Sequence, residues 1–274
     1  MMKKLQNRYQ MTRNKVSNID FLANQLENNS VDTVTTDPPY LIGYKDWDNQ
    51  AEDFHSMWLS ECFRVMKPGA TLWSFMAHCS KDGETFISHE FYKLLRMYFK
   101  VDLRNSVVWA RQKGRGASKH LKSQREDIFY ATKPGGDITY NPLKMLREVV
   151  TPYMKDGRPR GWFLDETGKR VRWTGLGNVW TYTSPFYLSK SDKQIHPAQK
   201  PVMLMERLIR LSSNEGDLIL DPFMGSGTTA IACKLSNRDF IGFEKDLDIY
   251  NKCEDRIANF NNKNYTEFNI YNKE

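Results

Sequence analysis

The chain has 274 residues, of which 40% are hydrophobic and 27% are charged, and this composition is typical of a globular protein with one large core. No apolar stretch predicts a membrane span or a secretory leader, and the four cysteines lack the spacing of a metal site or a disulfide framework. The formal net charge of +7 weakly favours a polyanionic partner, and together these features predict a reduced, cytoplasmic protein without a metal.

The first 110 residues alternate between predicted strands and helices. A β-branched run over residues 31–36 predicts a strand, which ends at Asp37-Pro38-Pro39. Apolar positions at helical spacing over residues 52–66 predict a helix that stops at Lys67-Pro68-Gly69. A strand over 71–76, a helix over about 84–98 and a strand over 106–109 follow. This alternation predicts an α/β fold with a mostly parallel sheet covered by helices on both faces.

The alternation weakens in the middle of the chain and returns towards its end. Residues 111–195 are basic, aromatic and loop-rich, which predicts a functional insertion. Beyond it the predicted elements are a helix that residues 196–201 open and that runs to about 211, a strand over 217–220, a helix from 228, a strand over 240–243 and a helix over 247–258. Residues 259–274 form an Asn-rich tail.

Basic residues cluster at the start of this insertion. The cluster comprises Arg111, Lys113, Arg115, Lys119, Lys122 and Arg125, with Gly114 and Gly116 among them. Such a run is often only a solvated face. The glycines, however, would let a loop bring several cations onto adjacent phosphates, so these residues are predicted to bind DNA.

A glycine-rich segment connects a predicted strand to a predicted helix near the end of the chain. It reads Asp221-Pro222-Phe223-Met224-Gly225-Ser226-Gly227-Thr228-Thr229. Strand, turn and helix in this order form the unit that binds nucleosides at the carboxyl end of a sheet. The absence of a lysine before Thr228 argues against a phosphate loop, whereas a dinucleotide fingerprint stays open because Ala230 could take its third small position.

S-adenosylmethionine fits this loop best, because it carries no phosphate and its amino group, sulfonium and ribose diol all favour carboxylates. Asp221, at the strand end, is predicted to meet the cationic methionine head. Glu244 follows Gly225 by nineteen residues, at the end of the next strand, and is placed for the ribose hydroxyls. The alternative is that Glu244 is an exposed acid at a strand end.

The segment Asp37-Pro38-Pro39-Tyr40 suits a planar exocyclic amine. The lone pair of such an amine is delocalised into the ring, and two acceptors on its N–H bonds would release it. The Asp37 carboxylate and the Pro38 carbonyl can be these acceptors, since neither proline offers a competing N–H. Tyr40 can stack on a flipped base, a contact worth roughly 1–3 kcal/mol. Alternatively, the prolines only end the strand and Tyr40 only packs.

Together these segments resemble the β group of S-adenosylmethionine-dependent DNA amino-methyltransferases, in which the catalytic tetrapeptide precedes the cofactor loop. The loop matches the family motif Asp-Pro-Phe-x-Gly-Ser-Gly-Thr-Thr at every fixed position. Residues 196–201 read His-Pro-Ala-Gln-Lys-Pro and depart from the family's usual segment at Ala198. Weaker echoes lie at residues 46–48, 65–69 and 105–109, so the resemblance covers nearly the whole chain outside the insertion and the tail.

This resemblance implies a Rossmann-like methyltransferase with a mostly parallel seven-stranded sheet. Residues 1–110 would form the catalytic half, 111–195 the target-recognition region, 196–260 the cofactor-binding half and 261–274 a tail. The implied reaction is methyl transfer to the N6 amine of an adenine that has been rotated out of the DNA duplex.

The resemblance also implies the residues of the site. Asp37, Pro38, Pro39 and Tyr40 would be catalytic, and Asp37 would also touch the cofactor. The implied cofactor-binding set is completed by Gln199, Lys200 and Pro201, at a helix start that faces the methionine carboxylate, and by Asp221, Pro222, Phe223, Gly225, Ser226, Gly227, Thr228 and Glu244. An upstream acidic residue of the family falls on Asn18 by spacing or on Asp20 by chemistry.

Several functions stay open. Aspartate at position 37 favours adenine because cytosine-N4 enzymes of the family more often carry serine there, but cytosine-N4 and RNA adenine methylation are near alternatives. A catalytically silent DNA-binding subunit and a dinucleotide oxidoreductase are the alternatives from other classes. The predicted partner is DNA, with a homodimer and a cognate restriction endonuclease left open for a bacterial or phage-encoded protein, and neither a membrane nor a metal is expected.

Overall fold

The structure is a computed structural model that describes residues 12–43, 46–78, 86–115, 123–150, 153–182, 194–262 and 265. Its centre is an eight-stranded sheet in the order β1-β13-β12-β2-β3-β5-β4-β11. These strands are β1 (Lys15–Ser17), β2 (Val31–Thr36), β3 (Met66–Ala77), β4 (Asp102–Arg115), β5 (Ser123–Thr132), β11 (Val179–Tyr182), β12 (Leu218–Asp221) and β13 (Asp239–Phe243). All neighbours pair in parallel except β5, which runs antiparallel to both β3 and β4. The predicted α/β fold with a mostly parallel sheet is therefore confirmed.

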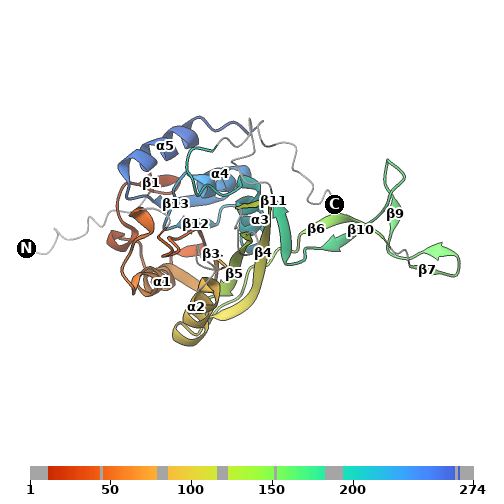
Figure 1. Cartoon of the computed structure of the whole chain (residues 1–274), viewed down its shortest axis with the longest axis horizontal. Helices are drawn as coiled ribbons and strands as arrows, with labels where there is room; N and C mark the ends of the chain where they lie inside the picture. The colour runs from red at the N-terminus through yellow and green to blue at the C-terminus, as the bar shows by residue number, and fades with distance from the viewer. Residues whose placement is uncertain are drawn as a thin grey trace, which may run out of the picture.

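Helices cover both faces of this sheet (Figure 1). Two of them, α1 and α2, pack on one face, and three, α3, α4 and α5, pack on the other. Their bounds are α1 (Phe54–Val65), α2 (Ile87–Lys93), α3 (Val202–Ser212), α4 (Thr228–Leu235) and α5 (Leu247–Ala258). Shorter helical segments are η1 (Phe21–Ala23), η2 (Asp46–Asp48) and the π-helical turn η3 (Leu94–Tyr98).

Alternating side chains divide the core into two layers. On β3, Leu72 and Met76 join the cluster under α1 and α2, whereas Trp73 and Phe75 join the cluster under α3 and α4. The short strand β12 follows the same rule, with both neighbours of Ile219 on the opposite face. A strand buried on both faces is apolar at successive positions, which is why these segments are continuous hydrophobic runs.

The sheet reverses its direction of growth beside β2. The chain moves from β2 to β3 on one side and later places β12 on the other side of β2, so β2 and β12 are parallel neighbours. Such a switch point leaves a crevice beyond the carboxyl ends of the two strands, where ligands bind in open α/β sheets. The two segments singled out from the sequence, residues 37–40 and 221–229, follow these two strand ends.

Two sequence predictions about the core need correction. The sheet has eight strands and not seven, since β1 adds an edge strand beside β13. Lys67-Pro68-Gly69 does not separate helix from strand, because β3 already begins at Met66. Gly69 has φ +82, and a Cβ there would lie 2.1 Å from the Asp137 carbonyl oxygen, so close backbone contact explains this glycine.

The predicted insertion over residues 111–195 is only partly separate from the core. Both β5 and β11 belong to the large sheet, although they lie inside this range. A separate arm projects from the end of the sheet near β4 and β11 (Figure 1). It contains a three-stranded sheet and a two-stranded one, built from β6 (Lys144–Glu148), β7 (Met154–Lys155), β8 (Arg158–Pro159), β9 (Phe163–Leu164) and β10 (Arg170–Gly175).

Helix α1 carries a partly buried histidine. The Nδ1 atom of His55 accepts a hydrogen bond from Trp58 Nε1 at 3.1 Å, and its buried Nε2 has no hydrogen-bond partner among the described residues. Burial lowers the pKa of His55 from 6.5 to about 4, since the interior disfavours the imidazolium.

We predict that His55→Gln makes the free energy of unfolding less dependent on pH. Between pH 6.5 and about 4 the unfolded wild type binds a proton at His55 that the folded protein does not bind, so stability falls as pH falls, by about 1.4 kcal/mol per pH unit. Glutamine keeps an acceptor for Trp58 and does not titrate. Denaturant unfolding at pH 7 and pH 5 measures the difference, with exposed His89→Gln as the control. Equal pH slopes for His55→Gln and wild type would contradict this account.

Candidate active site

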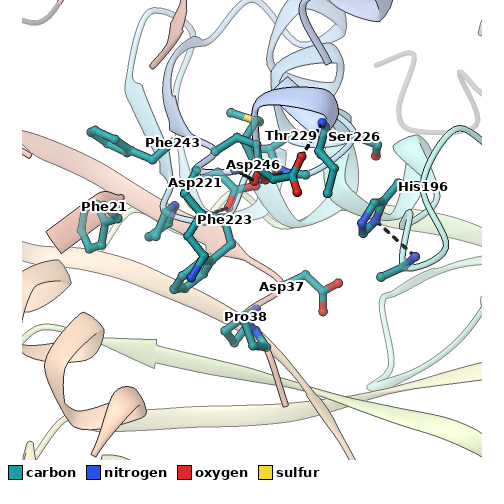
Figure 2. Close-up of a pocket in the computed structure, with 18 of the residues that line it drawn as sticks. Phe21, Asp37, Pro38, His196, Asp221, Phe223, Ser226, Thr229, Phe243 and Asp246 are labelled. Atoms are coloured by element: carbon teal, nitrogen blue, oxygen red, sulfur yellow. Dashed lines mark hydrogen bonds between the residues drawn. The ribbon is translucent and has the colours of Figure 1, made fainter. Parts of the chain in front are cut away.

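A cavity of about 430 Å³ opens where the ends of β2 and β12 meet. Figure 2 shows Asp37 and Pro38 on one side of it and Asp221, Ser226 and Thr229 on the other. Its volume lies within the range of small-molecule and cofactor sites. The structure therefore brings together two segments that lie more than half the chain apart.

Asp221 joins the two strands at the base of this cavity. Its carboxylate accepts hydrogen bonds from Thr36 Oγ1 on β2 (2.8 Å), Thr229 Oγ1 on α4 (2.5 Å) and the Phe223 N–H (3.1 Å). Only 3% of Asp221 is exposed, and burial raises its pKa to about 6. These bonds give Asp221 a role in holding the loop, and its predicted contact with a methionine ammonium stays a prediction.

Two glycines shape the loop between β12 and α4. Gly225 and Gly227 have φ +52 and +78, in the left-handed region that favours glycine. The Gly225 N–H donates to Glu244 Oε2 at 3.0 Å, so Glu244 fixes the loop from the end of β13. Glu244 lines the cavity, and burial raises the pKa of its carboxyl. Contact between Glu244 and a ribose stays a prediction.

The segment before α3 forms another wall of the cavity. Gln199 and Lys200 line it, and both are nearly fully buried. Gln199 Oε1 accepts from the Ile195 N–H at 3.0 Å, which closes a turn just before the α3 N-cap at Pro201. Of the sequence-predicted cofactor residues, all line the cavity except Pro201 and Gly227.

The predicted catalytic tetrapeptide adjoins this wall, and all four of its residues line the cavity. Asp37 Oδ1 accepts a hydrogen bond from the Tyr40 hydroxyl at 2.5 Å, and Asp37 Oδ2 accepts one from Lys200 Nζ at 2.5 Å. Burial raises the pKa of Asp37, and nearby Lys200 opposes this rise. Burial alone would lower the pKa of Lys200, but Asp37 and Glu126 raise it, so the ammonium stays charged.

Asp48 holds the turn that follows the tetrapeptide. Its Oδ1 accepts from the Tyr40 N–H (2.6 Å) and the Leu41 N–H (2.9 Å), and its Oδ2 accepts from the Ile42 N–H (2.8 Å). These bonds stabilise Leu41 at φ +62, a rare conformation for a branched side chain. In the sequence, Asp48 belongs only to the weak family match at residues 46–48, which does not predict that it holds this turn.

The structure adds Glu126, which the sequence did not indicate, and pairs it with Arg111, which the sequence predicted only as a DNA-binding residue. Glu126 on β5 lies with Oε2 3.3 Å from the Tyr40 hydroxyl and 3.4 Å from Lys200 Nζ. Arg111 NH1 lies 2.9 Å from Glu126 Oε1. The antiparallel pairing of β5 with β3 brings Glu126 next to the cavity. The sequence could have indicated Glu126 only if β5 had been predicted as a strand.

The predicted DNA-binding cluster is spread over different surroundings. Arg111 pairs with Glu126 beside the cavity, whereas the Arg125 Nε donates to Asp127 Oδ1 at 2.7 Å. Both lie on paired strands and not on a loop, which corrects the expected conformation of this part of the cluster. Lys113 and Arg115 belong to β4, and Lys119 and Lys122 lie outside the described residues.

The two candidates for the upstream acidic position lie in different surroundings, and a contact of either with the cofactor stays a prediction. Asp20 lines the cavity, whereas the Asn18 side-chain amide donates to the Glu244 and Lys245 carbonyl oxygens at 2.9 and 3.2 Å. Within the described ranges, no helix is long and apolar enough to cross a membrane, and no His, Cys, Asp and Glu side chains gather as a metal-binding group.

Comparisons with known proteins identify the class. The DNA methylase family model N6_N4_Mtase matches residues 31–255. Type II methyltransferase M.HpaI of Haemophilus parainfluenzae is 34% identical over 240 residues, which cover 85% of this chain and 69% of M.HpaI. DNA adenine methyltransferase YhdJ of Escherichia coli (strain K12) is 33% identical over 231 residues, covering 78% and 72% of the two chains.

Solved structures agree on the fold. The PvuII cytosine-N4-specific DNA methyltransferase aligns with a TM-score of 0.63 at 18% identity, over 93% of this chain and 91% of that one. The M1.HpyAVI complex with S-adenosylmethionine aligns with a TM-score of 0.58 at 22% identity, over 88% and 98%.

The fold and the site thus define a Rossmann-like methyltransferase whose cofactor is S-adenosylmethionine. The chain belongs to the DNA methylase family, and the resemblance inferred from its motifs is confirmed.

Gly227 offers a test of how the cofactor loop is held. A Cβ built there would lie 2.8 Å from Cys253 Sγ on α5, whereas a Cβ on Gly168, with nearly the same φ of +80, would meet nothing within 4 Å. We predict that Gly168→Ala lowers the free energy of unfolding by about 1 kcal/mol, the cost of the left-handed conformation. Gly227→Ala should lose about 2–4 kcal/mol because overpacking adds to that cost, and should also weaken cofactor binding.

Denaturant unfolding and calorimetric titration with S-adenosylmethionine measure the two effects. Equal losses of stability in both variants would show that contact with α5 does not constrain the loop.

Proposed function

We propose that the protein methylates the N6 amine of an adenine rotated out of DNA, at a specific sequence. The observation that carries this proposal is the position of Asp37, a carboxylate at the end of β2 that faces the same cavity as the cofactor loop. YhdJ, a relative at 33% identity, is described as a DNA adenine methyltransferase. The aspartate at this position further supports adenine over cytosine.

The chain's own residues supply positioning and charge. When bound, S-adenosylmethionine supplies an activated methyl group on its sulfonium. The Asp37 carboxylate and the Pro38 carbonyl would accept hydrogen bonds from the two amine N–H groups, which returns the lone pair to the nitrogen. Tyr40 would stack on the base through its ring, while its hydroxyl holds Asp37. Such preorganised acceptors are typically worth about 10²–10³ in rate.

The carboxylates around the cavity suit this cationic cofactor. Asp20, Asp221 and Glu244 all line it, so the cavity presents carboxylates to a bound cofactor. Gln199 and Lys200 line the cavity just before α3, so the positive end of this helix dipole would favour the methionine carboxylate.

Replacing Asp37 tests its role. We predict that Asp37→Ala lowers turnover by about 10²-fold or more while the affinity for S-adenosylmethionine stays near that of the wild type, because only the amine loses an acceptor. Tritium transfer to DNA and calorimetric titration measure the two quantities, and Asp255→Ala, on the exposed side of α5, is the control. Normal turnover of Asp37→Ala would remove Asp37 from the chemistry.

We propose that the arm recognises the target DNA. On one face of its sheet Arg172 of β10 lies directly opposite Arg147 of β6, and Arg170 is on the same face two residues away. All three arginines are exposed. Like charges directly opposite each other destabilise a sheet, so this arrangement is best explained by a polyanion that neutralises both.

We predict that Arg172→Ala weakens DNA binding for every sequence and lowers the slope of log affinity against log salt concentration by about one. The fold should be unharmed, because the substitution relieves the repulsion with Arg147. Binding titrations at several salt concentrations test this, with Lys93→Ala on α2 as the matched loss of a surface cation. An unchanged salt slope would show that this face makes no phosphate contact.

The cellular setting follows from the relatives. Several are described as bacterial type II methyltransferases, which supports a place in the bacterial cytoplasm beside a cognate restriction endonuclease. A homodimer is a further proposal, and sedimentation with and without DNA tests it.

The decisive experiment for the proposed function is incubation with labelled S-adenosylmethionine and mixed genomic DNA, followed by identification of the modified nucleoside. We expect N6-methyladenine in one sequence context. N4-methylcytosine would change the target base, and no transfer at all would favour a silent DNA-binding subunit.

A further inference from the structure

A row of alternating charges leads from β4 to the catalytic carboxylate. Arg111 NH1 lies 2.9 Å from Glu126 Oε1, Glu126 Oε2 lies 3.4 Å from Lys200 Nζ, and Lys200 Nζ lies 2.5 Å from Asp37 Oδ2. Glu126 and Lys200 are 8% and 7% exposed, so these charge contacts lie away from bulk water. Low local dielectric strengthens each of these contacts.

Both oxygens of Asp37 already have a donor in this arrangement. The Tyr40 hydroxyl donates to Oδ1 and the Lys200 ammonium donates to Oδ2, both at 2.5 Å. A carboxylate that is tied to an ammonium is a poorer acceptor for a neutral amine. The proposed function needs Asp37 to accept from the target amine, so the present donors must move or be shared.

One atom is within reach of both donors. Glu126 Oε2 lies 3.3 Å from the Tyr40 hydroxyl and 3.4 Å from Lys200 Nζ. Arg111 contacts the other carboxylate oxygen, Oε1, and so keeps Oε2 directed towards the two donors. A short movement of the flexible lysine side chain would exchange its close partner from Asp37 to Glu126.

We propose that Glu126 is a positioning residue that takes over the Lys200 ammonium when the target amine enters, which frees Asp37 Oδ2 to accept the amine N–H. This inference rests on the proposed function. Lys200 cannot simply withdraw, because an unpaired buried charge is strongly unfavourable. Glu126 keeps it paired throughout the exchange.

Among the described residues, Lys200 has two anionic partners, Asp37 and Glu126. The groups near the ammonium are Asp37, Glu126, His196 and the rings of Tyr40 and Phe75, whose centroids lie 5.5 and 5.2 Å from Lys200 Nζ, and Arg111 lies behind Glu126. Burial lowers the pKa of His196 to about 4, so at neutral pH His196 contributes no charge.

Glu126→Gln tests the proposal, since it keeps the size of the side chain and removes its charge. With S-adenosylmethionine and DNA both saturating, we expect the single-turnover methylation rate at neutral pH to fall about tenfold or more, with little change in cofactor affinity. Glu126→Asp keeps the charge but has a shorter side chain, so its methylation rate should lie between that of Glu126→Gln and that of the wild type. Glu90→Gln, in an exposed ion pair on α2, is the matched control.

The pH profile separates positioning from a structural role. Without Glu126, Lys200 loses one of the two carboxylates that raise its pKa, so its ammonium deprotonates at lower pH than in the wild type. The rate of Glu126→Gln relative to wild type should therefore recover as pH rises towards the lowered pKa of Lys200 in the variant, because a neutral amine no longer ties up Asp37. A merely structural defect would lower the rate by the same factor at every pH.

The outcomes are distinguishable from failure of the proposed function. Wild-type methylation of adenine tests that function alone, and the ratio of variant to wild type tests Glu126. A wild-type rate in Glu126→Gln, or a loss that does not change with pH, would overturn the proposal. If Glu126→Gln does not fold, Glu126→Asp carries the test, and a wild-type rate in that variant would overturn it.

Discussion

Asp221 connects the two halves of the site through its hydrogen bonds to Thr36 on β2 and Thr229 on α4. It has three donors and almost no contact with water, so it fixes the β2 end, the loop after β12 and the start of α4 as one unit. Asp37 comes one residue after Thr36, and its position relative to the cofactor loop follows from this carboxylate. A buried acid whose charge is satisfied by short hydrogen bonds is costly to disturb, which suits a site that must hold two reactants in register.

Around this unit, charged side chains from two other segments hold the loop and Asp37. Glu244 fixes Gly225 from the end of β13, and Lys200 approaches Asp37 from the segment before α3. The cavity thus combines several carboxylates that suit a cationic cofactor with Asp37, the proposed catalytic carboxylate, which accepts hydrogen bonds from Tyr40 and Lys200. The exchange of Lys200 between Asp37 and Glu126 would let the same pocket keep its charges paired both with and without a target base.

Much of this could be predicted from the sequence, because the motifs follow strands whose apolar runs are continuous. The strand over 31–36 and the helix over 247–258 agree with β2 and α5 to the residue. The convergence of Asp37 with the glycine loop also followed, since parallel strands place their carboxyl ends at one edge.

The rest depended on contacts that no local pattern encodes. Strand β5 carries Glu126 and Asp127 next to its apolar positions, so its periodicity did not indicate a core strand, and its antiparallel return next to β3 was missed. Arg111 pairs with Glu126, and the Tyr40 hydroxyl donates to Asp37. Both contacts depend on how the side chains pack in the folded protein, so the sequence pattern did not predict them. Target recognition over residues 111–195 was predicted as one insertion, whereas part of this range completes the large sheet.

A crystal structure of the protein with S-adenosylhomocysteine and a DNA duplex that contains its target sequence would test the role of Asp37 most directly. We expect an extruded adenine whose amine nitrogen lies about 2.7–3.2 Å from an Asp37 oxygen, with the cofactor sulfur beside the β12 loop. An extruded base whose amine is held by other residues, or a cofactor bound away from this loop, would contradict it.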